Sequence, residues 1–99
     1  MKRHFVYILS SKKRGTLYIG VTSNLSRRIY EHKQKLLIGF SQRYDVTILV
    51  HVEEFSLMVD AIDREKYLKK WNRLWKINLI EKDNPEWKDL SEYLLYANL

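Results

Sequence analysis

Two short runs of aromatic and β-branched residues near the start of the chain predict a β-hairpin. The runs are residues 5–10 and 16–20, and the polar, basic residues 11–15 lie between them. Residues of these types favour strands, and a polar segment ending in Gly favours the connecting turn. If the turn is centred on positions 12 and 13, Tyr7 faces Tyr18 across the hairpin. Directly opposed side chains lie about 5 Å apart, so both hydroxyls are expected to serve one site.

A helix is predicted next, over residues 25–37. Asn24 and the two hydroxyl residues before it supply an N-cap, and the helix is expected to end near Gly39. Its apolar positions are Leu25, Ile29 and Leu36. Arg28 and His32 are four residues apart on one edge of this apolar stripe, so they are neighbours on the helix surface.

The rest of the chain predicts a third strand and further helices. The predicted segments are a strand over residues 46–52, helices over 57–72 and 71–80, and a short last helix that Pro85 opens and that ends at Tyr96. The strand is nearly all apolar, which is typical of a central, covered strand. Glu53 and Glu54 are expected to lead into the next helix, and a break is expected near Asn72. We therefore expect one domain over residues 1–99, of mixed α/β (α+β) class and in the order β-β-α-β-α-α.

The charge is distributed unevenly along the chain. Residues 1–43 carry ten Lys or Arg against one acid, and residues 44–99 carry eight against eleven, so the two parts have charges of +9 and −3. Such asymmetry indicates a protein that meets phosphates. The alternative is a solvated cationic face without a ligand. The residues expected to contact a nucleic acid are Lys12, Lys13, Arg14, Arg27 and Lys33.

Length and composition exclude several classes of protein. A chain of 99 residues buries about 60 to 70% of its unfolded surface, which leaves room for one small core. It has no cysteine, so a disulfide framework and a thiolate zinc site are excluded. No segment approaches the roughly 20 apolar residues that span a bilayer. We expect a soluble, cytoplasmic, monomeric protein that does not bind membranes.

Glu65 is a carboxylate within an apolar helical stripe. The stripe consists of Leu57, Met58, Ala61, Ile62 and Leu68. A carboxylate at such a position is costly unless it is paired or bound to a metal ion. Mg²⁺ is commonly held by one or two carboxylates together with water and phosphate oxygens. The alternative is a structural ion pair with Arg64, Lys69 or an arginine of the first helix.

Three other residue types suit phosphate chemistry, and each has an ordinary structural alternative. Arg28 presents a planar fork that matches phosphate, although Arg27 is an equal candidate on periodicity alone. His32 could share a proton with the tyrosines or cap an apolar face. The ordinary pKa of tyrosine is about 10, so Tyr7 and Tyr18 need a nearby metal ion and arginine to act as bases, and otherwise they are common strand residues.

The order of these features resembles the GIY-YIG nuclease family. That family has two strands with tyrosine-containing triplets about ten residues apart, a helix with Arg and a later helix with Glu. The second triplet is intact as Tyr18-Ile19-Gly20, whereas the first reads Phe5-Val6-Tyr7. The resemblance covers about residues 4–84 and is closest to the short, stand-alone bacterial branch, because of the segment Asn84-Pro85-Glu86-Trp87. It implies a small three-stranded antiparallel sheet flanked by helices.

The resemblance also implies roles for individual residues. Tyr7 would be the general base, and Tyr18 would help to orient the attacking water. Arg28 matches the family arginine because it precedes His32 by four positions, as in the family motif. Glu65 would be the single protein ligand of one Mg²⁺ or Mn²⁺ ion.

Two positions would support this site. Gly20 would let the backbone pass close to it, and Asn84 resembles a late asparagine that supports the site in several members. The implied reaction is hydrolysis of a DNA phosphodiester by water, in DNA repair or processing, with RNA not excluded as substrate. A recruiting protein partner is a further expectation for so small an enzyme.

Two other classes of function compete with the nuclease. One is a non-catalytic nucleic-acid-binding module on the same fold, although a retired enzyme would be expected to lose one of the four catalytic residue types. The other is an interaction domain that uses tryptophans, but their helical spacing is more typical of a core. These tryptophans are Trp71, Trp75 and Trp87.

Overall fold

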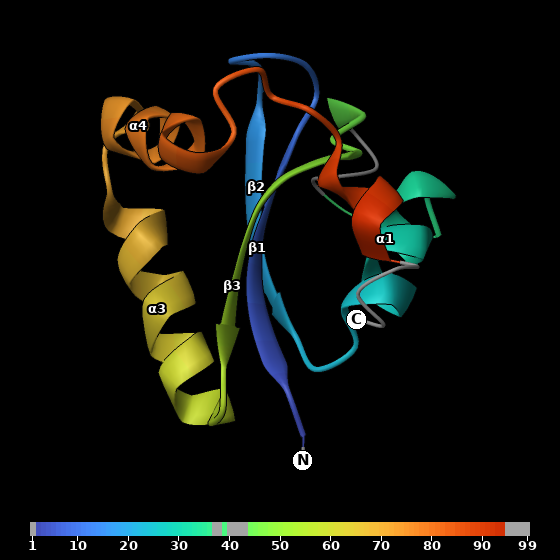
Figure 1. Ribbon diagram of the computed structural model, residues 1–99, viewed down its shortest axis with the longest axis vertical. Coiled ribbons are helices and arrows are strands. Elements are labelled where there is room, and N and C mark those ends of the chain that lie inside the picture. The colour runs from blue at the N-terminus through green and yellow to red at the C-terminus, as the bar shows by residue number, and fades with distance from the viewer. Residues whose placement is uncertain (1, 37–38, 40–43, 95–99) are drawn as a thin grey trace.

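The computed structural model describes residues 2–36, 39 and 44–94, whose helices pack on both faces of a three-stranded sheet (Figure 1). In chain order the elements are β1 (His4–Ser10), β2 (Leu17–Thr22), α1 (Leu25–Lys33), β3 (Ile48–Phe55), α3 (Met58–Lys70), α4 (Arg73–Asp83) and the 3₁₀ helix η1 (Leu90–Tyr93). The strand order is β2-β1-β3, and both pairings are antiparallel. Helix α1 lies on one face of the sheet, and α3 and α4 lie on the other. The predicted fold class and the order of its main elements are confirmed.

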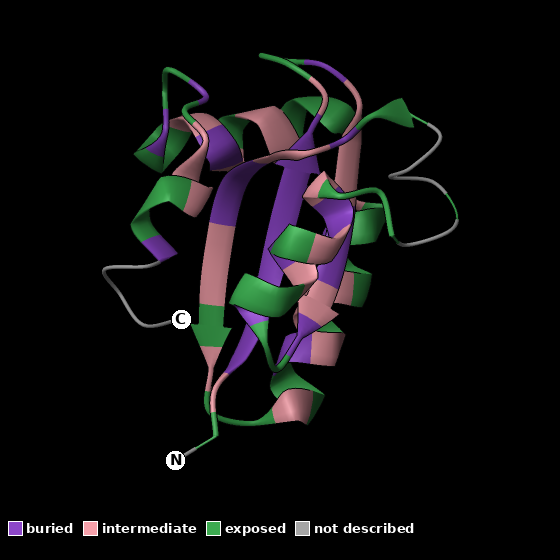
Figure 2. Cartoon of the chain, turned by 90° about the vertical axis from the view of Figure 1, so that its right-hand side faces the viewer, coloured by how far each residue is buried: buried purple, intermediate pink, exposed green. Residues whose placement is uncertain are grey.

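Strand β1 is the centre of the sheet, and all seven of its residues are buried (Figure 2). Its side chains alternate between two apolar clusters, so that Tyr7 belongs to the α1 side and Ile8 to the side of α3 and α4. The prediction of a central third strand is wrong, because β3 lies at an edge. Helices nevertheless cover both faces of this edge strand, because Leu49 packs in the α1-side cluster and Val50 in the cluster on the side of α3 and α4. This two-sided burial explains why the sequence of β3 is apolar.

The hairpin register differs by two residues from the predicted one. Tyr7 pairs with Gly20, and Leu9 pairs with Tyr18. Backbone hydrogen bonds within residues 11–16 close the loop and move the centre of the turn one residue later. Because side chains alternate with a period of two, this shift leaves both tyrosines on the same face of the sheet, with ring centroids 6.2 Å apart.

Helix α1 ends earlier than the apolar spacing predicts. Its last residue is Lys33, and Lys35 then has a positive φ of 56°, which cannot continue a right-handed helix. Leu36 is consequently exposed instead of buried in the α1 stripe. The Lys33 ammonium lies 2.6 Å from a carboxylate oxygen of Asp89 and 3.0 Å from the Thr47 carbonyl oxygen, so distant partners hold this helix end.

The predicted last helix is wrong at its start. Pro85 lies in a turn, and Trp87 has a φ of 56°, so helical geometry does not begin at the proline. The short helix η1 begins instead after Asp89, whose carboxylate accepts a 3.0 Å hydrogen bond from the Ser91 N–H. The predicted end at Tyr96 lies outside the described residues.

An ionic network ties α3 to β3 and thereby positions Glu65. Glu53 lies in β3 and not in the connection that was predicted, and it accepts hydrogen bonds of 2.8 and 3.1 Å from Arg64 of α3. Its other partner is His51 at 2.7 Å. Burial raises the pKa of Glu53, but the hydrogen bonds from His51 and Arg64 outweigh burial and hold it at about 2. Glu65 follows Arg64 directly, so this anchor limits its movement.

The three tryptophans occupy different environments. Trp87 is buried, and its indole N–H donates a 2.7 Å hydrogen bond to Glu81. Trp71 packs against the α3/α4-side cluster, whereas Trp75 is 55% exposed, so the prediction that all three belong to the core is wrong for Trp75. The helical break at Asn72 is confirmed, because its side chain accepts the Trp75 N–H at 2.9 Å as an N-cap. None of the helices in the described parts of the chain is long and apolar enough to cross a membrane.

Candidate active site

Tyr7, Tyr18 and His32 meet between the sheet and α1. The Tyr7 hydroxyl oxygen lies 3.0 Å from Nε2 of His32, and both residues are at least 98% buried. The Tyr18 ring centroid lies 5.1 Å from that of His32 and 6.2 Å from that of Tyr7. The three side chains come from β1, β2 and α1, so the tertiary fold brings them together.

The environment of this cluster determines which atom carries the shared proton. Burial raises the pKa of Tyr7, and the charges of Tyr18 and Glu65 act in the same direction, whereas Arg28 opposes them. Burial and the Arg28 charge lower the pKa of His32, and Glu31 opposes this shift. At neutral pH the phenol is therefore protonated and the imidazole is neutral. In the tautomer of neutral His32 that carries its proton on Nδ1, Tyr7 donates the hydrogen bond and Nε2 accepts it.

Gly20 provides the space for the Tyr7 phenol. A Cβ atom at position 20 would lie 2.5 Å from Cζ of Tyr7 and directly against its hydroxyl. Real Cβ atoms do not approach other atoms so closely, and the Tyr7 ring is packed into the core. The absent side chain at position 20 therefore allows the hydroxyl of Tyr7 to reach His32.

We expect Gly20→Ala to displace the Tyr7 ring and to destabilise the fold by about 1 to 3 kcal/mol, as overpacking of a core does. Urea denaturation of the wild type and the variant measures this change. A double-mutant cycle with Tyr7→Leu supplies the control, because Gly20→Ala should cost clearly less once the ring is gone. An equal cost in both backgrounds would show that the close approach to Tyr7 is not its cause.

Two arginines lie at the start of α1, and the structure distinguishes them. Arg27 and Arg28 both pair with Glu31, at 3.7 and 3.5 Å respectively. The charge of Arg28 opposes the rise in the pKa of Tyr7 and helps to lower the pKa of His32, so Arg28 is the arginine that acts on the buried cluster. A polar hollow of about 320 Å³ beside these residues is lined by Thr22, Ser23, Asn24, Arg27, Arg28 and Glu31. A phosphate in this hollow could meet the Arg28 guanidinium.

Glu65 lies on α3, and its side chain is 15% exposed. Of the partners that the sequence suggested, Lys69 is the one it meets, with Nζ 3.5 Å from a carboxylate oxygen, since Arg64 is held by Glu53. The negative charge of Glu65 contributes to the raised pKa of Tyr7, although α3 and α1 cover opposite faces of the sheet. The charge of Glu65 therefore influences the pKa of Tyr7 from a helix on the opposite face.

The oxygen donors at this site fit a hard divalent cation with few protein ligands. Among the described residues, no group of three or more His, Cys, Asp or Glu side chains could hold a metal ion. Among them, the available donor is the single carboxylate of Glu65. Mg²⁺ and Mn²⁺ accept a single carboxylate because water and substrate phosphates complete their coordination, whereas zinc prefers three or four nitrogen or sulfur ligands. Glu65 is thus the candidate ligand.

Within the described parts of the chain, Asn84 forms its hydrogen bonds with backbone groups of β3 and of the segment after α4, and not with the tyrosine cluster. It is buried at the C-terminal end of α4, and its amide nitrogen donates hydrogen bonds to the carbonyl oxygens of Val50 and Lys88, at 3.2 and 2.9 Å. Its amide oxygen accepts the Lys88 N–H at 3.0 Å. These bonds join the segment after α4 to β3, and a supporting role in the reaction stays a prediction.

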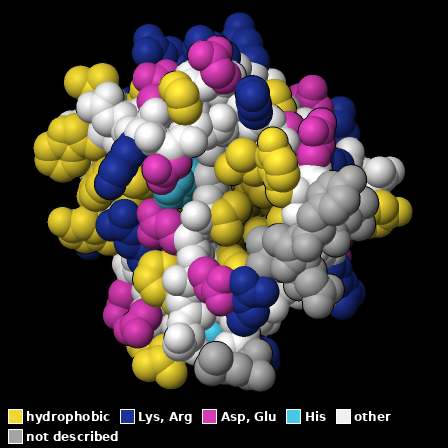
Figure 3. Space-filling view, in the orientation of Figure 1, with side chains coloured by type: hydrophobic (Ala, Val, Ile, Leu, Met, Phe, Trp, Pro, Cys, Tyr) yellow, Lys and Arg dark blue, Asp and Glu magenta, His cyan; other side chains and the backbone are white. Residues whose placement is uncertain are grey.

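Acidic residues from the second half of the chain neutralise part of the basic first half. Arg14 pairs with Glu81 through two hydrogen bonds of 2.9 and 3.0 Å, and Lys33 pairs with Asp89 at 2.6 Å. Figure 3 shows acidic and basic side chains intermixed on one face of the molecule. Among the described residues, the predicted phosphate contacts that form no ion pair are Lys12 and Lys13. Contacts of all five basic residues with a nucleic acid stay predictions.

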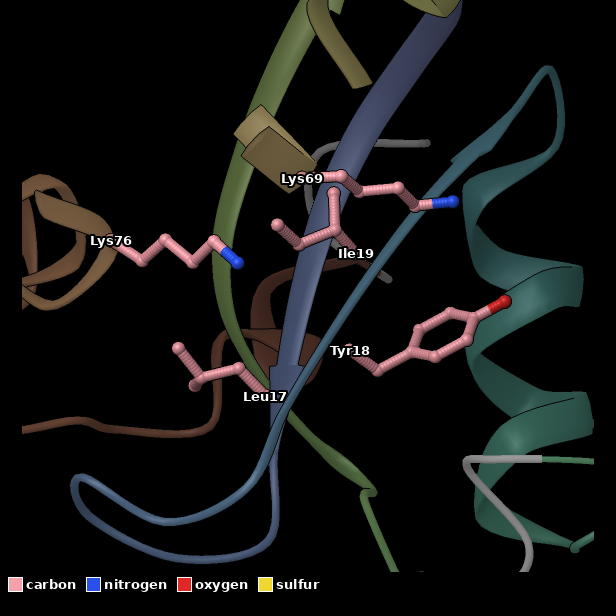
Figure 4. A pocket seen from close by; sticks show the side chains of 5 residues that line it. All are labelled: Leu17, Tyr18, Ile19, Lys69 and Lys76. Atoms are coloured by element: carbon pink, nitrogen blue, oxygen red, sulfur yellow. The ribbon is translucent and has the colours of Figure 1, made fainter. Parts of the chain in front are cut away.

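Two lysines line a groove near the cluster that the sequence did not predict. Lys69 and Lys76 line this open groove of about 230 Å³ beside Tyr18 (Figure 4). The sequence suggested Lys69 as an ion-pair partner of Glu65, but it did not indicate a groove. Lys76 carries no such signal, because it lies beyond the break at Asn72, and the angle between two helices cannot be read from periodicity.

Comparison with known proteins identifies relatives along most of the chain. Residues 3–78 match the family described as the GIY-YIG catalytic domain. The chain is 36% identical over 87 residues to a UPF0213 protein of Syntrophus aciditrophicus, which covers 87% of this chain and 98% of the relative. It is 33% identical over 81 residues to a UPF0213 protein of Staphylococcus haemolyticus, with coverage of 82% and 98%.

A solved structure supports the same relationship. The solution NMR structure of the UPF0213 protein BH0048 from Bacillus halodurans matches this fold with a TM-score of 0.55 and 26% sequence identity. The match covers 91% of this chain and 95% of that one. The family resemblance and the likeness to short, single-domain relatives are confirmed.

Proposed function

Because the chain belongs to the GIY-YIG catalytic domain family, whose members are generally nucleases, we propose that it is a divalent-metal-dependent endonuclease that hydrolyses phosphodiester bonds of DNA. The observation that carries the proposal is the buried 3.0 Å hydrogen bond between the Tyr7 hydroxyl and Nε2 of His32. When neutral His32 carries its proton on Nδ1, Nε2 accepts from the buried tyrosine and gives it a route to lose its proton.

Tyr7 and His32 together can remove a proton from water. The raised pKa of Tyr7 makes the free phenolate unfavourable, so Tyr7 alone is a weak base at neutral pH. When the Tyr7 oxygen takes a proton from water, its own proton can pass to Nε2 of His32, whose pKa is lowered and whose ring is neutral. General-base catalysis of this kind contributes about 10² to 10⁴-fold to a rate.

Tyr18 and Arg28 suit the substrate side of the reaction. The Tyr18 ring packs beside Tyr7 and His32. In this proposal its hydroxyl would help to orient the attacking water. The Arg28 guanidinium, close to the cluster, can stabilise negative charge that develops on the phosphate oxygens. A planar guanidinium matches a phosphate through paired hydrogen bonds.

Glu65 would hold the divalent cation. When bound, Mg²⁺ or Mn²⁺ supplies charge stabilisation to a scissile phosphate and its leaving oxygen. Glu65 directly follows Arg64, whose guanidinium donates two hydrogen bonds to Glu53 of β3. Lys69 offsets part of its charge in the free protein.

We expect the purified protein to cleave DNA with Mg²⁺ or Mn²⁺ and to show no cleavage in EDTA. Labelled duplex, single-stranded and branched DNA, each with a matched RNA, test the substrate class as well. Restoration of cleavage by excess Mg²⁺ after EDTA is the control for irreversible inactivation. Binding without cleavage on every substrate and with either metal would favour a non-catalytic nucleic-acid-binding module on the same fold.

A further inference from the structure

An open groove follows the outer edge of β2, next to the candidate active site. Leu17, Tyr18 and Ile19 of β2 form one side, and Lys69 of α3 and Lys76 of α4 form the other. In Figure 4 both lysine side chains extend toward the strand from separate helices. Two positive charges thus converge on a groove with a mainly apolar strand wall.

The two sides of this groove match the two chemical components of a nucleic-acid strand. The partly exposed side chain of Leu17 suits sugars and bases, whereas the ammonium groups of Lys69 and Lys76 suit phosphates. Ile19 is a buried core residue beneath the groove. Lysine acts as a point charge toward phosphate, and each phosphate that it neutralises releases counterions. The groove therefore offers an apolar surface for the bases and positive charges for the phosphates of a nucleic-acid strand.

Both walls of the groove adjoin residues of the proposed reaction centre. Lys69 lies 3.5 Å from Glu65, the candidate metal ligand. Tyr18 lines the groove, and its ring lies 6.2 Å from that of Tyr7 and 5.1 Å from that of His32. A strand in the groove would carry its next phosphate toward Tyr7 and Glu65.

Strand β2 also leaves one edge open to a ligand. Within the part of the chain that the structure describes, it pairs with β1 alone. Edge strands present unpaired backbone groups that invite pairing with another chain, and lysines at the edge discourage such pairing. Lys69 and Lys76 lie at this edge, so a polyanion is favoured over an added peptide strand.

We propose that one strand of the nucleic-acid substrate lies along the β2 edge, with successive phosphates on Lys69 and Lys76. This assignment rests on the proposed function and adds a strand path to it. It also adds two lysines on α3 and α4, beside the reaction centre, to the basic residues that are predicted to contact phosphates.

Binding of a labelled oligonucleotide in EDTA, as a function of salt, tests the strand path without cleavage. We expect Lys69→Gln with Lys76→Gln to weaken binding and to reduce the slope of log affinity against log salt by about two, or about one for each lost phosphate contact. Lys66→Gln with Lys82→Gln is the matched control. It removes the same charge from the same two helices at exposed positions outside the groove.

Each outcome decides the strand path. Weaker oligonucleotide binding in the Lys69/Lys76 double variant alone supports the strand path. Equal weakening in the Lys66/Lys82 control would reveal only general attraction between the cationic protein and DNA, and would contradict it. Unchanged oligonucleotide affinity in both double variants would overturn the strand path. It would also be overturned if a glutamate-rich peptide bound through Lys69 and Lys76 while the oligonucleotide did not bind. Because the assay needs no cleavage, an inactive protein with groove-dependent binding would refute the proposed hydrolysis and leave the strand path intact.

Discussion

Glu65→Ala should abolish most DNA cleavage, by about 10³-fold, while folding and DNA binding stay close to those of the wild type. The variant removes the candidate protein ligand of the cation, and loss of about 4 kcal/mol of transition-state stabilisation corresponds to this factor. The fold should tolerate the change, because the partner of Glu65 is Lys69, whose side chain is 54% exposed. Initial cleavage rates with Mg²⁺, at protein concentrations matched by unfolding curves, measure the effect.

Asp63→Ala is the matched control for this experiment. It removes an exposed carboxylate from the same helix, two positions earlier, and should leave the cleavage rate within about twofold of the wild type, as exposed substitutions usually do. Metal-dependent cleavage that survives in Glu65→Ala, in protein purified free of host nucleases, would remove Glu65 from the reaction. Equal losses in both variants would indicate a general effect of charge on α3.

Tyr7→Phe should reduce cleavage by about 10² to 10⁴-fold, the usual contribution of a general base. The change removes one hydroxyl and keeps the ring that fills the α1-side core, so the free energy of unfolding should fall by about 1 kcal/mol. Tyr30→Phe is the control, because it removes the hydroxyl of an exposed tyrosine on α1. A comparable loss in Tyr30→Phe, or none in Tyr7→Phe, would contradict the assignment.

The pH dependence of kcat tests the proton route through His32. The pKa of this histidine is lowered from its ordinary value of 6.5, so the ring is neutral above that lowered value and protonated below it. Protonated His32 cannot accept from Tyr7, and the wild-type rate should therefore fall about tenfold for each pH unit below this pKa. Residual cleavage by Tyr7→Phe should lack this acid limb, which rates from about pH 5 to about pH 8 would reveal. A merely structural Tyr7 would leave the limb unchanged.

Local patterns in the sequence were sufficient for most elements of the fold. The hairpin, the N-cap at Asn24 and the break at Asn72 depend on neighbouring residues, and each is present. The face on which Tyr7 and Tyr18 lie is equally local, because an error of two in register does not change it. The exact strand register could not be predicted from neighbouring residues, since it depends on the loop at residues 11–16 and on the space that Gly20 leaves for the Tyr7 ring.

The main errors concerned the position of a strand in the sheet and the ends of helices, because contacts with residues distant in the sequence determine both. Helix α1 stops where Lys33 meets Asp89, and the apolar strand β3 lies at an edge because helices cover both of its faces. The count of charges was misleading for a similar reason. Folding places Glu81 against Arg14 and Asp89 against Lys33, so part of the apparent cationic half is neutralised.

The residue types of the candidate site and their order could be predicted before the fold was known, since the triplet Tyr18-Ile19-Gly20 and the spacing of Arg28 and His32 are properties of the chain. The folded arrangement was needed to show that the Tyr7 hydroxyl shares a hydrogen bond with Nε2 of His32, that the charge of Glu65 helps to raise the pKa of Tyr7 from a helix on the opposite face of the sheet, and that two lysines line the β2 edge. The physical reason is that burial, proton affinity and groove shape depend on side chains from different elements, whose distances no sequence spacing specifies.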